Sequence, residues 1–141
     1  ILLNEFFLKK MKSKKFGRIV HISSAATVNH DGKMPYICSK TYLNSYIRQM
    51  SKKVSKSNIL LNGILPGAII AYKNNLYNLI KKNKINKKSF KKKYLNVKEI
   101  GTTNSIIPVL EFLLSKHNNY LLGELIKIDG GEKWMAQWII L

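Results

Sequence analysis

The stretch Tyr36-Ile37-Cys38-Ser39-Lys40, preceded by Pro35, decides the fold of this chain. Proline suits the first position of a helix, where its missing N–H would be unpaired anyway. Apolar residues then recur at helical spacing, which predicts a helix that continues to Val54. On such a helix Tyr36 and Lys40 lie four residues apart and share a face.

The pairing of Tyr36 with Lys40 indicates proton-transfer chemistry. An ammonium group beside a phenol stabilises the phenolate form, so the phenol can exchange its proton more readily near neutral pH. A hydroxyl group from Ser24, a short way upstream, could hold a substrate oxygen in place for it. Tyrosine and lysine at this spacing are also common on helices. An amphipathic helix with a solvated lysine is therefore an alternative interpretation at this point.

Three further stretches help to decide between a catalytic Tyr36–Lys40 pair and a plain amphipathic helix. Residues 17–24 (GRIVHISS) have the pattern of a buried strand that ends in hydroxyl groups. Residues 62–67 (NGILPG) predict a second strand ending in a turn, and residues 123–131 (GELIKIDGG) predict a third.

In this order, the four stretches resemble the short-chain dehydrogenase/reductase family, from about Ile1 to Gly131. The resemblance implies an α/β fold, a Rossmann-like parallel sheet with flanking helices. It also implies an NAD(P)-dependent oxidoreductase that transfers hydride between NAD or NADP and a small-molecule carbonyl or alcohol substrate. A homo-oligomer, a dimer or tetramer, is expected for the complete protein on the same ground.

The resemblance also implies roles for individual residues. Tyr36 would be the general acid/base, and Lys40 would bind the nicotinamide ribose and tune the tyrosine. Ser24 would anchor the substrate oxygen. The backbone that follows Pro66 and Gly67 would meet the nicotinamide carboxamide, although a Pro-Gly pair can also be an ordinary turn.

The segment before Tyr36 departs from the family pattern. Thr27 stands where glycine is expected, and the interval from Ser24 to Tyr36 is one residue shorter. Either the predicted loop, residues 25–34, is tighter, or Ser23 takes the anchoring role. We favour Ser24 because the end of the strand sets the alignment.

The dinucleotide-binding front half of the family is not recognisable in this sequence. It contains no glycine-rich turn between a strand and a helix, and no acidic residue at the end of a second strand. We therefore expect a single partial domain over residues 1–141, the back half of a Rossmann fold whose N-terminal half is missing. Alone, such a chain should bind dinucleotide poorly.

Residues 68–96 correspond to the variable flap that covers the substrate in the family. A solvated, mobile lid is one interpretation of its lysines; attraction of an anionic substrate is the other. Nucleotide sugars or acyl chains on an acidic carrier would be such substrates. The overall sequence is most similar to the broad group of 3-oxoacyl-carrier-protein reductases, with sugar-modifying reductases as neighbours. The lysines of this flap include Lys81, Lys82, Lys84, Lys87, Lys88, Lys91, Lys92 and Lys93.

The formal net charge of +18 raises the question of nucleic-acid binding. Of the 25 basic residues only Arg18 and Arg48 are arginine, whose planar guanidinium favours phosphate and base recognition. We therefore expect no nucleic-acid partner. Two rival functions stay open, a basic anion- or nucleic-acid-binding module and a catalytically incompetent fragment that at most dimerises.

The cysteine and histidine residues give further expectations. Cys38 is the single cysteine, so no internal disulfide can form, which agrees with a cytoplasmic location. We expect Cys38 and His21 to be packing residues. The three histidines show no metal-ligand spacing, so no metal site is expected. No apolar run reaches the roughly 20 residues that span a bilayer, so no membrane partner is expected.

The remaining chain predicts further helices. One runs through the first eleven residues and stops before Gly17. Another is expected over residues 97–116, where Pro108 either kinks the helix or lies in the first turn of a shorter one. The apolar tail, residues 134–141, could pack on a neighbouring subunit.

Overall fold

A three-stranded parallel sheet forms the centre of the computed structural model, which describes residues 2–30 and 32–132. The strands lie in the order β1-β2-β5, with bounds Gly17–Ile22, Ile59–Pro66 and Leu125–Ile128. The middle strand β2 is buried along nearly its whole length, as expected for a strand of a covered parallel sheet. The predicted Rossmann-like sheet is thereby confirmed.

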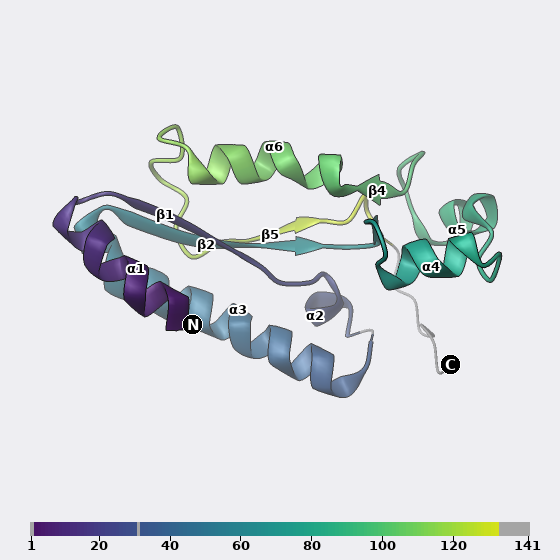
Figure 1. Cartoon of the computed structure of the whole chain (residues 1–141), viewed down its shortest axis with the longest axis horizontal. Coiled ribbons are helices and arrows are strands. Elements are labelled where there is room, and N and C mark those ends of the chain that lie inside the picture. Colours follow the sequence, from purple (N-terminus) through teal and green to yellow (C-terminus); the bar gives the residue numbers. More distant parts are fainter. Residues whose placement is uncertain (1, 31, 133–141) are drawn as a thin grey trace.

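Helices cover both faces of this sheet (Figure 1). Helix α6 (Thr103–Leu114) lies on one face, and α1 (Leu2–Ser13) and α3 (Met34–Val54) lie on the other. The larger core cluster joins α1, α3 and the first half of β2 through five buried apolar side chains. They are Leu8, Ile47, Val54, Ile59 and Leu61.

Helix α3 carries the predicted catalytic pair and follows the sequence prediction closely. Pro35 lies in its first turn, where no helical N–H is lost. The helix ends at Val54, and a short 3₁₀ turn, Ser55–Ser57, leads to Asn58, which adopts a positive φ of 56°. The chain then enters β2 directly.

Strand β1 is less buried than the sequence predicted. Within the described residues it pairs on one side only, with β2, and so lies at the edge of the sheet. Gly17 is buried, whereas the side chain of Ile22 is 51% exposed. The sequence pattern of an apolar strand is the same at the edge of a sheet as in its centre. The pattern therefore did not reveal that β1 pairs on one side only within the described residues.

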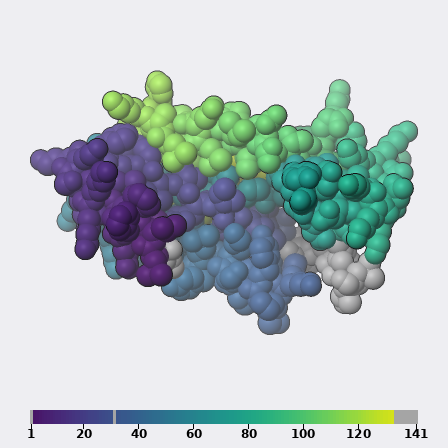
Figure 2. Space-filling view, viewed as in Figure 1, coloured from purple at the N-terminus to yellow at the C-terminus, as the bar shows by residue number. Residues whose placement is uncertain are grey.

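The flap, residues 68–96, forms a small folded unit rather than an extended loop. It contains β3 (Ile69–Ile70), α4 (Asn75–Lys81) and α5 (Lys87–Tyr94), and β3 pairs with β4 (Gly101–Thr102). Figure 2 shows these residues gathered at one end of the molecule, away from α1. A second core cluster holds the unit together, made of Leu76, Phe90, Leu95 and Ile100.

Three local predictions were wrong. A short helix, α2 (Ala26–Asn29), stands inside the region predicted as a loop. Helix α6 begins at Thr103 rather than at residue 97, because Gly101 and Thr102 pair with β3 instead. Pro108 consequently lies inside α6 and not in its first turn. Cys38 is exposed rather than packed.

The apolar tail at residues 134–141 lies outside the described residues. Within residues 2–30 and 32–132, none of the helices has the length and apolar character needed to cross a bilayer.

Candidate active site

Residues predicted for the site stand at the ends of two central strands. Ser23 and Ser24 come directly after β1, and Pro66 ends β2 and is followed by Gly67. At the end of the third strand, β5, the chain continues into Asp129. Because the strands are parallel, these carboxyl ends meet at one edge of the sheet, where α/β folds of this kind bind their ligands.

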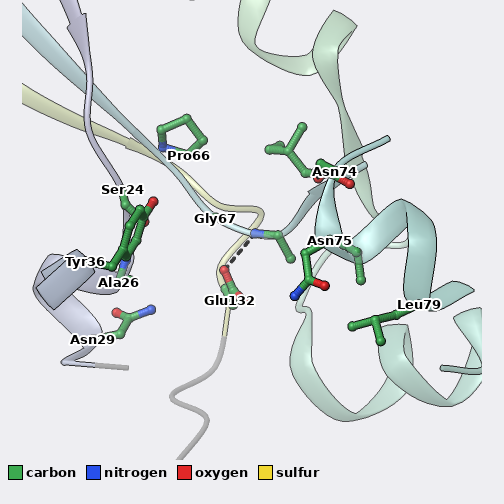
Figure 3. A pocket seen from close by; sticks show the side chains of 13 residues that line it. Ser24, Ala26, Asn29, Tyr36, Pro66, Gly67, Asn74, Asn75, Leu79 and Glu132 are labelled. Atoms are coloured by element: carbon green, nitrogen blue, oxygen red, sulfur yellow. Dashed lines mark hydrogen bonds between the residues drawn. The ribbon is translucent and has the colours of Figure 1, made fainter. Parts of the chain in front are cut away.

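A cavity of about 410 Å³ opens at this edge (Figure 3). It brings together Ser24, Tyr36, Pro66 and Gly67, which come from three separate elements of the chain. Part of the flap forms the opposite wall of the cavity. The other lining residues are Ala26, Asn29, Ala68, Ile69, Asn74, Asn75, Leu76, Leu79 and Glu132.

Lys40, the fifth predicted site residue, does not line this cavity but lies beside Tyr36. Its Nζ is 5.9 Å from the centroid of the Tyr36 ring, one helical turn away on α3. The ammonium group donates a hydrogen bond to the main-chain oxygen of Ile22 at 2.8 Å. The end of β1 therefore fixes the lysine close to the phenol.

The structure distinguishes the two candidate serines. Ser23 is buried, its N–H donates to the oxygen of Ile64 at 2.8 Å, and it does not line the cavity. Ser24 does line it, and its Oγ accepts a hydrogen bond from the N–H of Ala26 at 3.2 Å. Of the two, only Ser24 presents its side chain beside Tyr36.

Thr27 accounts for the tight segment after Ser24. Its hydroxyl group donates to the main-chain oxygen of Ser24 at 2.8 Å and accepts from Nδ2 of Asn44 at 2.9 Å. Asn44 belongs to α3, the helix that carries Tyr36. Thr27 thus ties the serine segment to the tyrosine helix, a role that glycine could not fill.

Glu132 is a site residue that the sequence did not reveal. Its Oε2 accepts a hydrogen bond at 3.0 Å from the N–H of Ala68, the residue that follows the Pro66-Gly67 turn. Gly130 and Gly131, with φ values of 63° and 68°, let the chain turn back after β5. A Cβ at Gly67 would collide with Asp129 and Glu132, so only glycine permits this approach.

The charge of the cavity differs from that of the chain as a whole. Among its described lining residues Glu132 is the only charged one, and none of the flap lysines is included. Lys81 and Lys87 instead line a separate cavity of about 270 Å³ with Ile70, Tyr77 and Ile80. The flap lysines therefore do not line the site cavity.

His21 lies away from this cavity, inside the packing of β1 against the helices. Its Nε2 is 2.8 Å from Nδ2 of Asn4, and its ring meets the ring of Tyr46 edge-on. Burial lowers the pKa of His21 below its usual 6.5. Residues 2–30 and 32–132 contain no group of three or more potential metal ligands.

The fold and the site together define a class, the α/β folds that bind ligands at the carboxyl ends of parallel strands. The chain belongs to the short-chain dehydrogenase/reductase family, and it corresponds to the C-terminal part of a family member. Residues 2–133 match the family described as enoyl-(acyl carrier protein) reductase.

Curated relatives agree with this assignment. The chain is 29% identical over 131 residues to 3-oxoacyl-(acyl-carrier-protein) reductase FabG of Rickettsia bellii. It is 28% identical over 131 residues to the protein of the same name from Aquifex aeolicus. These matches cover 92% of this chain but 52% and 50% of the relatives. The chain thus spans about half the length of the curated relatives it matches.

Solved structures show the same fold. ElxO with NADP bound superposes with a TM-score of 0.79 at 24% identity, covering 91% of this chain and 51% of ElxO. A 4-hydroxyisoleucine dehydrogenase complexed with NADH and succinate has a TM-score of 0.74 at 28% identity. That match covers 96% of this chain and 54% of the dehydrogenase.

Proposed function

We propose that this chain is the catalytic part of an NAD(P)-dependent oxidoreductase acting on a carbonyl or alcohol substrate. One observation carries the proposal: Ser24, Tyr36 and the Pro66-Gly67 turn, far apart in sequence, line one cavity. Lys40 lies one helical turn from the tyrosine, beside that cavity. The family of the chain supports the same reaction class.

The residues present fit a nicotinamide group. The N–H of Ala68 already holds a carboxylate oxygen, so a carboxamide oxygen could be bound by the same donor. The missing side chain at Gly67 allows a close approach of the backbone. A bound nicotinamide dinucleotide would supply or accept the hydride.

In this proposal two side chains, Tyr36 and Ser24, contact the substrate oxygen, and a third, Lys40, acts on Tyr36. Tyr36 donates its proton to that oxygen during reduction and takes it back during oxidation. Lys40 stabilises the phenolate that remains, from its position 5.9 Å from the ring centroid. Ser24 donates a hydrogen bond as negative charge builds on the oxygen, with its segment held by Thr27.

Binding of the cofactor to the chain tests the proposal. We expect NADH and NADPH to bind weakly in calorimetric titrations, because the chain lacks a glycine-rich turn for the pyrophosphate. Nuclear magnetic resonance should show the amide signals of Gly67 and Ala68 shifting during the same titration. Unchanged amide signals at saturating dinucleotide would instead favour a fragment without catalytic function.

Several properties of the complete protein belong to this proposal as well. The names of the reductase relatives suggest a substrate that is carried as an acyl group on an acyl carrier protein. We also propose that residues 1–141 are one partial domain and that the complete protein forms a homo-oligomer.

A further inference from the structure

A second cavity lies within the flap, apart from the predicted active site. It has a volume of about 270 Å³ and is lined by residues of β3, α4 and the start of α5. Among the described residues, it shares no lining residue with the larger cavity that holds Ser24 and Tyr36. The residues that line the second cavity are Ile70, Tyr77, Ile80, Lys81 and Lys87.

Helix α4 and strand β3 form the wall between the two cavities. Asn75 and Leu79 of α4 line the larger cavity, as Figure 3 shows. The residues of α4 that line the smaller cavity are three and four positions apart, so they share another face of the helix. Ile69 lines the larger cavity and Ile70 the smaller one, because successive side chains of a strand point to opposite sides. The smaller cavity is therefore a distinct site behind this wall.

The lining of the smaller cavity is mainly apolar. Ile70 and Ile80 contribute aliphatic side chains and Tyr77 contributes its ring, and all three residues are half-buried. An engineered apolar cavity of roughly 150 Å³ can hold one benzene molecule. The volume of about 270 Å³ is therefore sufficient for an aliphatic chain of moderate length.

The charged part of the lining is positive. Lys81 and Lys87 are exposed, and neither ammonium group forms an ion pair within residues 2–30 and 32–132. The flap, residues 68–96, contains no aspartate or glutamate. The first acidic residue after it, Glu99, is paired with Lys91 at 2.8 Å. Two ammonium groups beside an apolar interior are thus available to an anion.

We propose that this cavity is a binding site for an apolar anion, a medium-chain aliphatic carboxylate. The carboxylate contacts the two lysines, which supply the countercharge that an anion needs when it leaves water. The chain lies against the apolar side chains and is stabilised by its burial. This inference goes beyond the proposed function and does not depend on it, because the two cavities have different lining residues.

Octanoate and octanol provide the first test, because they have the same chain and differ in charge. Both are titrated into the chain at low salt, and the amide signals of Ile70 and Ile80 are followed by nuclear magnetic resonance. We expect octanoate to bind about tenfold more tightly than octanol, because only octanoate is attracted by the lysines. Rising ionic strength should reduce this difference.

A pair of double variants then tests the lysines themselves. Lys81→Gln combined with Lys87→Gln should weaken octanoate binding by about tenfold and leave octanol binding nearly unchanged. Lys82→Gln combined with Lys88→Gln is the matched control. These lysines directly follow the first two in the sequence, are exposed and do not line the cavity. The control removes the same net charge and should leave octanoate binding nearly unchanged.

Three results would overturn the proposal. Equal weakening in the two double variants would show a general attraction to the charge of the flap. Octanoate binding that is no tighter than octanol binding would show that the lysines take no part. A lack of saturable shifts at Ile70 and Ile80, or shifts at Tyr36 and Gly67 in their place, would show that this cavity is not the site. The proposed function is tested separately, by the titrations with NADH and NADPH.

Discussion

Nδ2 of Asn44 lies 2.9 Å from Oγ1 of Thr27, and this hydrogen bond joins helix α3 to the segment that carries Ser24. The same threonine hydroxyl donates to the main-chain oxygen of Ser24. Two predicted site residues, Ser24 and Tyr36, are thereby held on segments that are tied to each other. Their relative position depends on two residues that do not line the cavity.

Thr27→Val should loosen the serine segment without unfolding the protein. The valine keeps the shape of threonine but removes the hydroxyl that bonds Ser24 and Asn44. We expect a loss of about 1 kcal/mol in the local opening free energy, seen as faster hydrogen exchange over residues 25–29. Thr27→Ser keeps the hydroxyl and should restore most of the protection. Equal exchange in the valine and serine variants would show that the hydroxyl does not hold the segment.

Tyr36→Phe should remove most of the activity of the catalytically competent protein. The phenol is the proposed proton donor, and acid/base help of this kind contributes about 10²–10⁴ in rate. Steady-state kinetics should show the loss in kcat, with little change in cofactor binding. Tyr42→Phe, on the same helix but 65% exposed and outside the cavity lining, is the control. Normal activity of Tyr36→Phe would falsify the assignment.

The stability of the fold should decrease as the pH falls below about 6.5, because of His21. Burial lowers the pKa of this imidazole in the folded state, so the unfolded state binds more protons just below its usual pKa of 6.5. The free energy of unfolding therefore falls as the pH drops from that value towards the folded-state pKa. Urea unfolding between about pH 5 and pH 8 measures it. His21→Gln should remove this part of the pH dependence, whereas substitution of the exposed His117 should leave it in place.

Phe90→Ala should destabilise the flap more than it destabilises the central sheet. Phe90 is 3% exposed and belongs to the second core cluster, which is separate from the cluster around β2. Removing a buried phenylalanine side chain typically costs about 3–5 kcal/mol. Hydrogen exchange should rise over residues 75–94 and change little in β2. Phe6→Ala, at a position that is 74% exposed, should change neither region, and equal effects on the flap and β2 would show that they unfold as one unit.

The sequence predicted the central elements because their signals are local. Pro35 marks the first turn of α3, and apolar residues on both sides of Asn62-Gly63 mark β2. The strand predicted within residues 123–131 was also confirmed, as β5 at Leu125–Ile128. Four predicted site residues meet at one cavity because the parallel strands end at the same edge.

The remaining features depend on contacts between distant residues. The β3–β4 pairing uses two residues from each strand, too few for a periodic pattern, and it shortens the helix predicted over residues 97–116. The place of Glu132 depends on where the chain turns after β5. In the sequence it is an acid after two glycines, and only the backbone N–H of Ala68 makes it part of the cavity.

The open side of β1 has a practical consequence for anyone who purifies this chain. A strand at the margin of a sheet can pair with the same strand of another molecule and start aggregation. Repulsion between chains of charge +18 opposes such pairing in dilute buffer, and added salt screens that repulsion. Samples should therefore remain clear at low ionic strength and become turbid as salt is raised, the reverse of ordinary salting-in.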